Sequence, residues 1–405
     1  MSARIPVLVL TPWPSFWEGA PGVGCSDEDE VHRGLAAAGF DVHYVMPRAR
    51  GAEPPVAPSH LTTGPHVLRW AGILPSGLRR PVRYWAYQGV YPGLGTRAGR
   101  KVRPRIVVGH SYVAARAAVR VARALGARSV TKFFGVMTLA RADQPEWLHR
   151  ARHWEMIDAF RAGADRVVVF DDGTHGDQAA LRYGVPPERL RFWPNGLDTS
   201  FRTRAPGRPR EELRARAGAG PDEMLVLMVN RLVDNKRVDV ALSAAAELAR
   251  PGRGVRFRLA LVGEGPLRSP LEAQVRELGL GPRVTFLGAQ THDQTFEWLH
   301  AADVFLGTSA LTNRSLTTLE AMMCGLPVVA TDAGDTRGLL RDGVDSLLAP
   351  AEPEVLAGAL ARLARDPALR RALGAAAREA SESFPGWPER VAREVALYHE
   401  LLGER

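Results

Sequence analysis

The stretch that decides the fold runs from Val304 to Ala330 and reads VFLGTSALTNRSLTTLEAMMCGLPVVA. It begins with a short apolar run (Val304–Leu306), continues through a polar loop into an amphipathic helix around Leu316–Met323, and ends in a second apolar run (Val328–Ala330). A strand, a helix and a second strand in this order are typical of parallel strands joined by a crossover helix. The stretch therefore predicts an α/β fold.

The same alternation extends over the rest of the chain. After residue 220 it comprises Leu225–Val229, Val238–Leu248, Arg258–Val262, Leu271–Leu278, Val284–Leu287 and Phe296–Ala301. In the first half it comprises Val7–Leu10, Asp27–Ala38, Val42–Val45, Ile106–Val108, Ala114–Leu125, Val130–Phe134, Val167–Phe170 and Gly176–Arg182. The segment Thr199–Pro209 is rich in Arg, Pro and Gly and is typical of a linker.

We therefore expect two doubly wound α/β domains, residues 1–198 and 210–384, with a linker at 199–209 and a helical C-terminus. Ligands of such sheets bind beyond the carboxyl ends of the strands. A cleft between two facing domains is therefore the expected site.

Composition excludes several classes of protein. The chain has 405 residues, 45% of them hydrophobic and 24% charged, which is normal for a globular protein. Its apolar runs are far shorter than the ~20 residues of a membrane span, and its N-terminus does not resemble a signal peptide. The two cysteines, Cys25 and Cys324, lie far apart, so we expect no disulfide framework and a cytoplasmic location.

The positive charge alone does not indicate nucleic acid. The formal net charge is +9, but only Lys101, Lys132 and Lys236 are lysines among 53 basic residues. Such a skew toward arginine favours a compositional bias. Nucleic-acid binding would also need aromatic residues along a basic groove, and one short stretch has them. We expect no nucleic-acid partner.

The first half offers weak candidates for a site. Gly22 and Gly24 lie in a glycine-rich loop between a strand and a helix, where backbone amides bind an anion or a sugar, or where the loop is only a turn. The acidic run that begins at Asp27 fits a helix start better than a metal site, because Ser26 and Asp29 match a capping box. His110 ends a predicted strand and either faces the cleft or serves as a core or capping histidine.

The second half offers stronger candidates. Arg231 and Lys236 lie in one strand-to-helix loop, where two fixed cations suit a pyrophosphate. Gly263 and Glu264 lie in a tight turn after the next strand. Glu320 lies on a partly buried helix face, where it would accept hydrogen bonds from ribose hydroxyls. The helix start preceding it offers free backbone amides for phosphate, over Thr312, Asn313, Arg314, Ser315 and Leu316.

In order and spacing, these segments resemble a GT-B glycosyltransferase of family 4, the retaining group that uses nucleotide sugars. The resemblance also includes Trp193–Asp198 and the C-terminal helix Trp387–Tyr398. It implies two Rossmann-like domains that face each other across a cleft, with the first domain binding the acceptor and residues 385–405 crossing back onto it. The donor would be a UDP-sugar or a GDP-sugar, and no metal or other cofactor is implied, since Arg231 and Lys236 neutralise the leaving diphosphate.

The resemblance also implies individual roles. Arg231 and Lys236 would hold the diphosphate, Glu320 the ribose, and the backbone near Arg283 and Val284 the base. The acceptor's proton would pass to the donor phosphate, so the protein supplies positioning and charge more than a nucleophile. With His110, the two cations are the expected catalytic residues.

Two positions depart from the family pattern. The family carries a second Glu eight residues before Glu320, where this chain has Thr312, and a His-Gly pair where this chain has Phe134 before Gly135. Both missing groups would read the donor sugar. We therefore expect a donor that lacks the 6-hydroxyl, with an ordinary glucose- or mannose-type donor as the alternative.

Other hypotheses stay open at this point. A nucleotide-sugar epimerase on the same fold would need a carboxylate and histidine set that the sequence does not show, and a non-catalytic nucleotide-sugar-binding protein would keep only the diphosphate site. The basic, aromatic segment 78–105 predicts peripheral binding to the inner membrane face and a lipid-linked acceptor. A soluble natural-product or saccharide acceptor, or a merely solvated loop, is the alternative.

Overall fold

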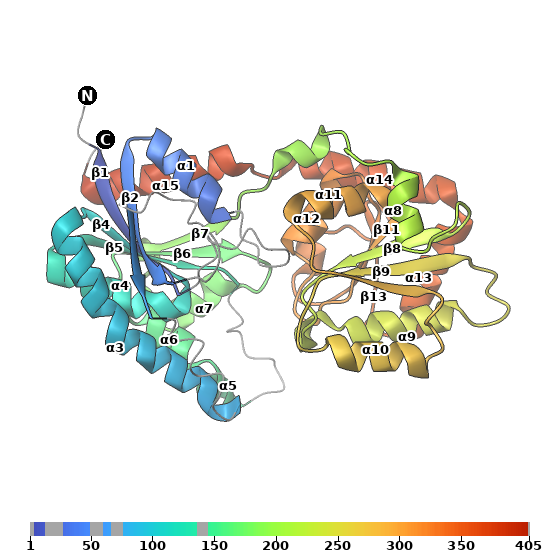
Figure 1. Ribbon diagram of the computed structural model, residues 1–405, viewed down its shortest axis with the longest axis horizontal. Helices are drawn as coiled ribbons and strands as arrows, with labels where there is room; N and C mark the ends of the chain where they lie inside the picture. Colours follow the sequence, from blue (N-terminus) through green and yellow to red (C-terminus); the bar gives the residue numbers. More distant parts are fainter. Residues whose placement is uncertain (1–3, 13–26, 49–59, 66–75, 136–144, 404–405) are drawn as a thin grey trace. The chain divides into compact units, whose positions relative to one another are not determined.

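The computed structural model describes residues 4–12, 27–48, 60–65, 76–135 and 145–403. These residues form two compact units, each built on a parallel sheet with helices on both faces (Figure 1). Unit 1 comprises the described residues through Gly196 together with those from Trp387 onward, and unit 2 comprises Leu197–Gly386. Both units are Rossmann-like, which confirms the predicted fold class.

Unit 1 contains a seven-stranded sheet with the order β3-β2-β1-β4-β5-β6-β7 among the described residues. Its strands are β1 (Ile5–Leu10), β2 (Phe40–Pro47), β3 (Leu61–Gly64), β4 (Ile106–His110), β5 (Arg128–Phe133), β6 (Arg166–Asp171) and β7 (Leu190–Pro194). Its helices are α1 (Asp27–Ala37), α3 (Ser76–Val102), α4 (Ser111–Leu125), α5 (Glu146–Arg152), α6 (Trp154–Phe160), α7 (Gly176–Arg182) and α15 (Trp387–Leu402). Helices α1 and α15 pack side by side on one face of this sheet (Figure 1).

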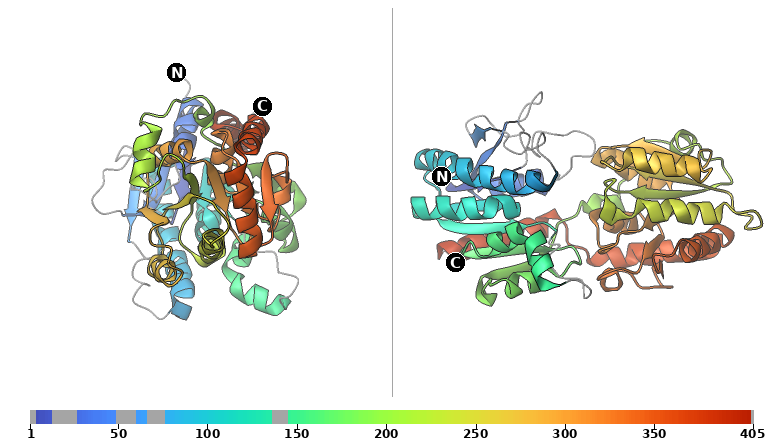
Figure 2. Two further views of the ribbon diagram at one scale, coloured as in Figure 1. Left: turned by 90° about the vertical axis from the view of Figure 1, so that its right-hand side faces the viewer. Right: turned by 90° about the horizontal axis from the view of Figure 1, so that it is seen from below.

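Unit 2 contains a six-stranded sheet with the order β10-β9-β8-β11-β12-β13 within the described ranges. Its strands are β8 (Met224–Val229), β9 (Phe257–Val262), β10 (Val284–Gly288), β11 (Val304–Gly307), β12 (Val328–Thr331) and β13 (Ser346–Ala349). Its helices are α8 (Arg210–Arg216), α9 (Val238–Leu248), α10 (Arg268–Glu277), α11 (His292–Ala301), α12 (Leu316–Met323), α13 (Pro353–Arg365) and α14 (Pro367–Ala380). Figure 2 shows helices above and below this sheet.

The strands of unit 2 are buried on both faces, as expected for a parallel sheet between helices. Met224, Val226 and Met228 face the core under α9, α10 and α13. Leu225 and Leu227 face the other core, under α8, α11 and α12. This layering leaves only the two ends of the strands open for a site.

The segment expected as a linker contributes to unit 2. A 3-10 helix (Thr199–Arg202) begins it, capped by the Asp198 carboxylate, which accepts from the Ser200 N–H at 3.0 Å. Phe201 is fully buried in the unit 2 core. The first part of this segment is therefore packed rather than free.

Residues 78–105, expected to be a membrane-binding segment or a solvated loop, are largely helical. Helix α3 continues through Pro81 and Pro92, two residues that disfavour a helix in sequence. Its glycines allow close packing: a Cβ at Gly95 would lie 2.9 Å from Val121 of α4, and one at Gly99 would collide with Leu125. The prolines and glycines that make this segment look non-helical in sequence are therefore compatible with a helix in the folded unit, and the glycines are required by its packing.

Helix α3 also turns most of its aromatic residues inward. Tyr84, Tyr87 and Tyr91 are buried, and the Tyr87 and Tyr91 rings stack with centroids 4.0 Å apart. Trp85 is 53% exposed, and its ring stacks on that of Trp154 with centroids 5.8 Å apart. The three tyrosines are thus not available to a membrane surface, which corrects the expectation of interfacial aromatics along this segment. No helix in the described ranges is long and apolar enough to cross a membrane.

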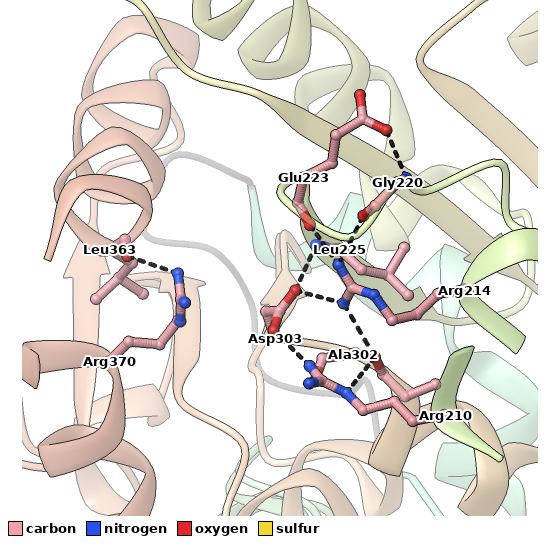
Figure 3. Close-up of polar contacts among 10 residues, drawn as sticks. Arg210, Arg214, Gly220, Glu223, Leu225, Ala302, Asp303, Leu363 and Arg370 are labelled. Carbon is pink, nitrogen blue, oxygen red and sulfur yellow. Dashed lines mark hydrogen bonds and ion pairs between the residues drawn. The ribbon is translucent and has the colours of Figure 1, made fainter. Parts of the chain in front are cut away.

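A polar network fastens α8 to the amino ends of β8 and β11 (Figure 3). The Asp303 carboxylate accepts from Arg214 at 2.7 Å, from Arg210 at 2.5 Å and from the Leu225 N–H at 2.8 Å. Arg214, which is buried, also donates to the carbonyl oxygens of Gly220 and Glu223. One carboxylate thus fixes two arginines and one strand.

Replacing Asp303 by Ala should lower the free energy of unfolding of unit 2 by about 3–5 kcal/mol, because Arg214 would stay buried without its counter-charge. Arg210→Ala, which removes a half-exposed partner, should cost less than about 1 kcal/mol. Urea unfolding followed by circular dichroism measures both, and equal losses would contradict the argument.

The same carboxylate should make stability depend on acid pH. Burial alone would raise the pKa of Asp303, but the bonds from Arg214 and Leu225 and the charges of Arg214 and Arg210 lower the pKa below 3.8 overall. Because the folded-state pKa is depressed, this stabilisation is present above about pH 4 and is lost as the pH falls through the folded-state value. The stability of Asp303→Ala should therefore decline less in acid than that of the wild type.

Candidate functional site

The loop at 230–237, here called the cation loop, lies at the carboxyl end of β8 and carries Arg231 and Lys236. The Asn230 N–H donates to the Val262 carbonyl at 3.0 Å, and the Leu232 N–H to that of Glu264 at 2.9 Å. These bonds join the loop to the end of β9. It is therefore held by backbone bonds independent of its charged side chains.

The other side of the cation loop is fastened to the segment after β11. The Ala310 N–H donates to the Asn235 carbonyl at 2.9 Å, and the Thr308 hydroxyl donates to the carbonyls of Lys236 and Arg237 at 2.9 Å. Arg237 has a φ of 47° and pairs with Asp239. Arg231 is exposed and Lys236 is half-buried. The two predicted diphosphate ligands thus share one rigid loop.

The Gly-Glu-Gly-Pro turn after β9 is explained by the cation loop. A Cβ at Gly263, whose φ is 131°, would collide with the Asn230 carbonyl oxygen, and one at Gly265 with that of Leu232. Only glycine permits this approach of the two backbones. The Glu264 carboxylate points to Arg268, which donates to it at 2.7 Å.

The loop before α12 is held together by its own polar side chains. Asn313 is buried; its amide donates to the Thr331 carbonyl at 2.7 Å, and its Oδ1 accepts from the Ser309 N–H at 3.2 Å. The Thr312 hydroxyl accepts from the Arg314 N–H at 3.1 Å. The side chains of Thr312 and Asn313 therefore shape the loop.

Arg314 and Ser315 lead from this loop into α12, which begins at Leu316. Nη1 of Arg314 lies 3.2 Å from Oδ2 of Asp335. Ser315 is the N-cap residue and accepts from the Thr318 N–H at 3.2 Å. Because β11 ends at Gly307, this helix start lies at the carboxyl edge of the sheet, together with the cation loop.

Glu320 is buried on α12 and lies beside a histidine that sequence reasoning missed. The Glu320 Oε1 lies 3.7 Å from Nδ1 of His292, and the Asp198 Oδ2 lies 3.7 Å from its Nε2. Burial lowers the pKa of His292, although the Asp198 and Asp293 charges oppose this. A neutral imidazole between two carboxylates is thus part of the Glu320 environment. The capping box of Thr291 and Gln294, which starts α11 at His292, was the available sequence signal.

Arg283 and Val284 lie at the opposite end of the sheet. Val284 begins β10, and the cation loop, the Gly263 turn and the start of α12 all follow carboxyl ends of strands. This corrects the expectation that backbone near Arg283 and Val284 reads the base of a donor bound at the carboxyl edge. The backbone after β10 at that edge begins at Gly288, whose carbonyl accepts from the Gly263 N–H at 2.8 Å.

Unit 1 has a pocket of its own near the carboxyl ends of its strands. His110, the last residue of β4, lies with its ring centroid 5.8 Å from that of Phe134, which in turn stacks on Phe170 at 4.6 Å. The lining residues are Val9, Val31, Leu35, Tyr44, His110, Lys132, Phe134, Asn195, Arg390 and Tyr398. The structure thus places His110 and Phe134 in one pocket. Gly22 and Gly24 lie outside the described residues.

A buried ionic cluster adjoins this pocket and fastens α15 to β5. The Glu394 carboxylate accepts from Lys132, from Arg390 at 2.7 Å and from the Tyr398 hydroxyl at 2.6 Å. All four side chains are buried. Burial raises the pKa of Tyr398, so its hydroxyl remains a donor. Of these four residues, Lys132, Arg390 and Tyr398 also line the unit 1 pocket.

Comparison with known proteins gives a consistent picture. The Glycosyltransferase Family 4 model matches residues 29–201, and the Glycosyl transferases group 1 model matches residues 209–380. A D-inositol 3-phosphate glycosyltransferase of Frankia alni is 31% identical over 395 residues, covering 92% of this chain and 93% of that protein. One from Acidothermus cellulolyticus is 35% identical over 255 residues, covering 60% of this chain and 55% of that protein, so the matched part spans little more than half of its length.

Solved structures share the fold of the whole chain. Sucrose-phosphate synthase from Thermosynechococcus elongatus superposes with a TM-score of 0.76 at 22% identity, covering 99% of this chain and 100% of that one. Anabaena HepE in complex with UDP-glucose superposes with a TM-score of 0.72 at 19% identity, covering 97% and 100%.

Proposed function

The chain belongs to the family 4 glycosyltransferases, and we propose that it moves a sugar, with retention, from a nucleotide diphosphate sugar to an acceptor hydroxyl. The observation that carries this proposal is the cation loop, which holds Arg231 and Lys236 at the carboxyl edge of the unit 2 sheet. Family membership favours transfer over the epimerase and over a non-catalytic binding protein. HepE, which has this fold, has been solved in complex with UDP-glucose. This supports a UDP-sugar as the donor, with a GDP-sugar as the alternative.

In the proposed mechanism, negative charge builds on the leaving diphosphate and is met by Arg231 and Lys236. Fixed cations of this kind stabilise the transition state without reorganising, so transfer needs no metal cofactor. The acceptor's proton passes to the donor phosphate oxygen on the same face of the sugar. Glu320 accepts hydrogen bonds from the ribose, and His110 is the proposed catalytic residue of unit 1.

We propose that the donor sugar lacks a 6-hydroxyl. Phe134, 37% exposed and stacked on Phe170, offers an apolar surface where the family has an imidazole. The Thr312 hydroxyl is already engaged by the Arg314 N–H and replaces a carboxylate. A hydroxymethyl group against Phe134 would lose its hydrogen bonds with water, which a pentose or 6-deoxy sugar avoids.

We propose that unit 1 binds anionic membranes through the exposed face of α3. Leu78, Val82 and Trp85 are exposed at helical spacing, and the exposed basic residues of the helix are Arg79, Arg80, Arg97, Arg100 and Lys101. Each charge near an anionic leaflet contributes about 1 kcal/mol. This surface supports a lipid-linked acceptor. The alternative is an acceptor in solution, and the inositol phosphate after which the relatives are named would be one.

Arg231→Ala and Lys236→Ala should each lower kcat/KM for the nucleotide sugar by about 10–150-fold, since each loses a charge-assisted bond of roughly 1.5–3 kcal/mol. Arg237→Gln is the matched control, because Arg237 lies in the same loop but pairs with Asp239. Its kcat/KM should change less than about threefold. Wild-type kinetics in either alanine variant would exclude the proposed diphosphate site.

The wild type should prefer a pentose or 6-deoxy donor to the matched hexose by about 5–150-fold in kcat/KM, from a desolvation cost of roughly 1–3 kcal/mol. Phe134→His should shift the preference toward the hexose, and Phe192→His, at an exposed position on β7, should not. Competition between paired UDP- or GDP-sugars decides this. A tenfold preference of the wild type for the hexose would disprove the role of Phe134.

Flotation with vesicles should carry the wild type with anionic but not neutral lipid. The double variant Val82→Ser, Trp85→Ala should float at least several-fold less, and Phe192→Ser should float like the wild type. Equal recovery with both lipids would remove the membrane proposal and favour an acceptor in solution.

A further inference from the structure

Asp41, His43 and His60 come together at an edge of the unit 1 sheet, apart from the pocket described above. Asp41 and His43 are two residues apart on β2, so they point to the same face of the sheet. His60 immediately precedes β3, and the pairing of Tyr44 with Leu61 brings it beside His43. Two adjacent strands thus deliver three side chains to one place.

The three side chains converge on a small volume. Nε2 of His43 lies 2.9 Å from Oδ2 of Asp41, and Nε2 of His60 lies 2.8 Å from Oδ1. The imidazole rings stack with centroids 4.5 Å apart and an interplanar angle of 27°. One ligand atom from each residue lies within 4.8 Å of the others, and all three side chains are half-buried. Both rings therefore direct the same nitrogen toward one carboxylate.

This donor set is the one that borderline transition metals select. Two imidazole nitrogens and a carboxylate oxygen suit Zn²⁺ and its neighbours, with bonds of about 2.0–2.2 Å. A carboxylate and neutral imidazoles are the forms in which these groups bind a metal ion.

We propose that Asp41, His43 and His60 form a binding site for a divalent transition metal ion, with Zn²⁺ as the fitting occupant. In the structure each Nε2–H donates to Asp41; when the ion binds, each neutral ring carries its proton on Nδ1 and gives the Nε2 lone pair to the metal. The half-exposed site leaves at least one coordination position for water.

The ion would act as a clip between two strands. It would link the amino-terminal half of β2 to His60, the residue before the edge strand β3. Asp41 and His43 lie in the amino-terminal half of β2, whereas His110 and Phe134 lie at carboxyl ends. Metal should therefore stabilise unit 1 without being required for sugar transfer, and the inference does not rest on the proposed function.

The test uses the full chain freed of metal with a chelator that is then removed. Equilibrium dialysis should give one tightly bound Zn²⁺ per wild-type chain, and Zn²⁺ should raise its melting temperature. His43→Gln and His60→Gln should each bind Zn²⁺ at least about tenfold more weakly and lose the thermal shift. His399→Gln is the matched control, because His399 lies on α15 beside Phe40 but outside the cluster.

Equal Zn²⁺ binding by all four proteins, or no binding by the wild type, would overturn the proposal and leave a hydrogen-bonded triad without an ion. If a variant fails to fold, Co²⁺ titration of the wild type decides the question. A visible absorption band that saturates at one equivalent and is abolished by Zn²⁺ supports the site, and the absence of such a band refutes it.

Discussion

The arrangement of the candidate site in unit 2 depends on the close approach of two backbones. The turn at Gly263 and Gly265 lies so near the cation loop that a side chain at either position would collide with a carbonyl oxygen. This contact, with the bonds from Thr308 and Ala310 on the other side, fixes the backbone positions of Arg231 and Lys236. Electrostatic preorganisation requires such rigidity, because cations that must first be assembled lose much of their advantage. The two glycines therefore help to hold the loop that carries the two charged residues.

The two ends of the strands in the unit 2 sheet, called here the amino edge and the carboxyl edge, have different roles. At the amino edge, Asp303 holds Arg210 and Arg214 in a satisfied network that contributes to stability (Figure 3). At the carboxyl edge, Arg231 and Lys236 lie on a loop that is fastened through its backbone groups. Basic residues thus stabilise the fold at one edge and are candidate ligands at the other.

Sequence periodicity was sufficient for most of the fold and insufficient for particular elements. Apolar runs such as Leu225–Val229 coincide with strands because parallel strands are buried on both faces. Helix α3 was missed because Pro81, Pro92 and the glycines that pack on α4 read as breakers, and their compatibility with a helix depends on tertiary contacts.

The candidate site could be proposed from the sequence where its residues are close together in the chain. Arg231, Lys236 and Glu320 lie in recognisable local motifs at strand and helix ends. His292 was not foreseen, because its neighbours Asp198 and Glu320 are distant in sequence. Arg283 was misplaced because a strand's direction decides which end reaches the ligand. The triad of Asp41, His43 and His60 depends on the pairing of β2 with β3, which no local pattern reveals.

The return of α15 to unit 1 has a consequence for how the protein is made. The core of unit 1 contains Leu397, Tyr398 and Leu401, and Lys132 donates to the buried Glu394 of the same helix. Unit 2, in contrast, is continuous from Leu197 to Gly386. On the ribosome, the second half of the chain can therefore complete its core before the first half does. Until α15 emerges, the nascent first unit lacks the helix that covers this apolar face and the Glu394 carboxylate that lies beside Lys132.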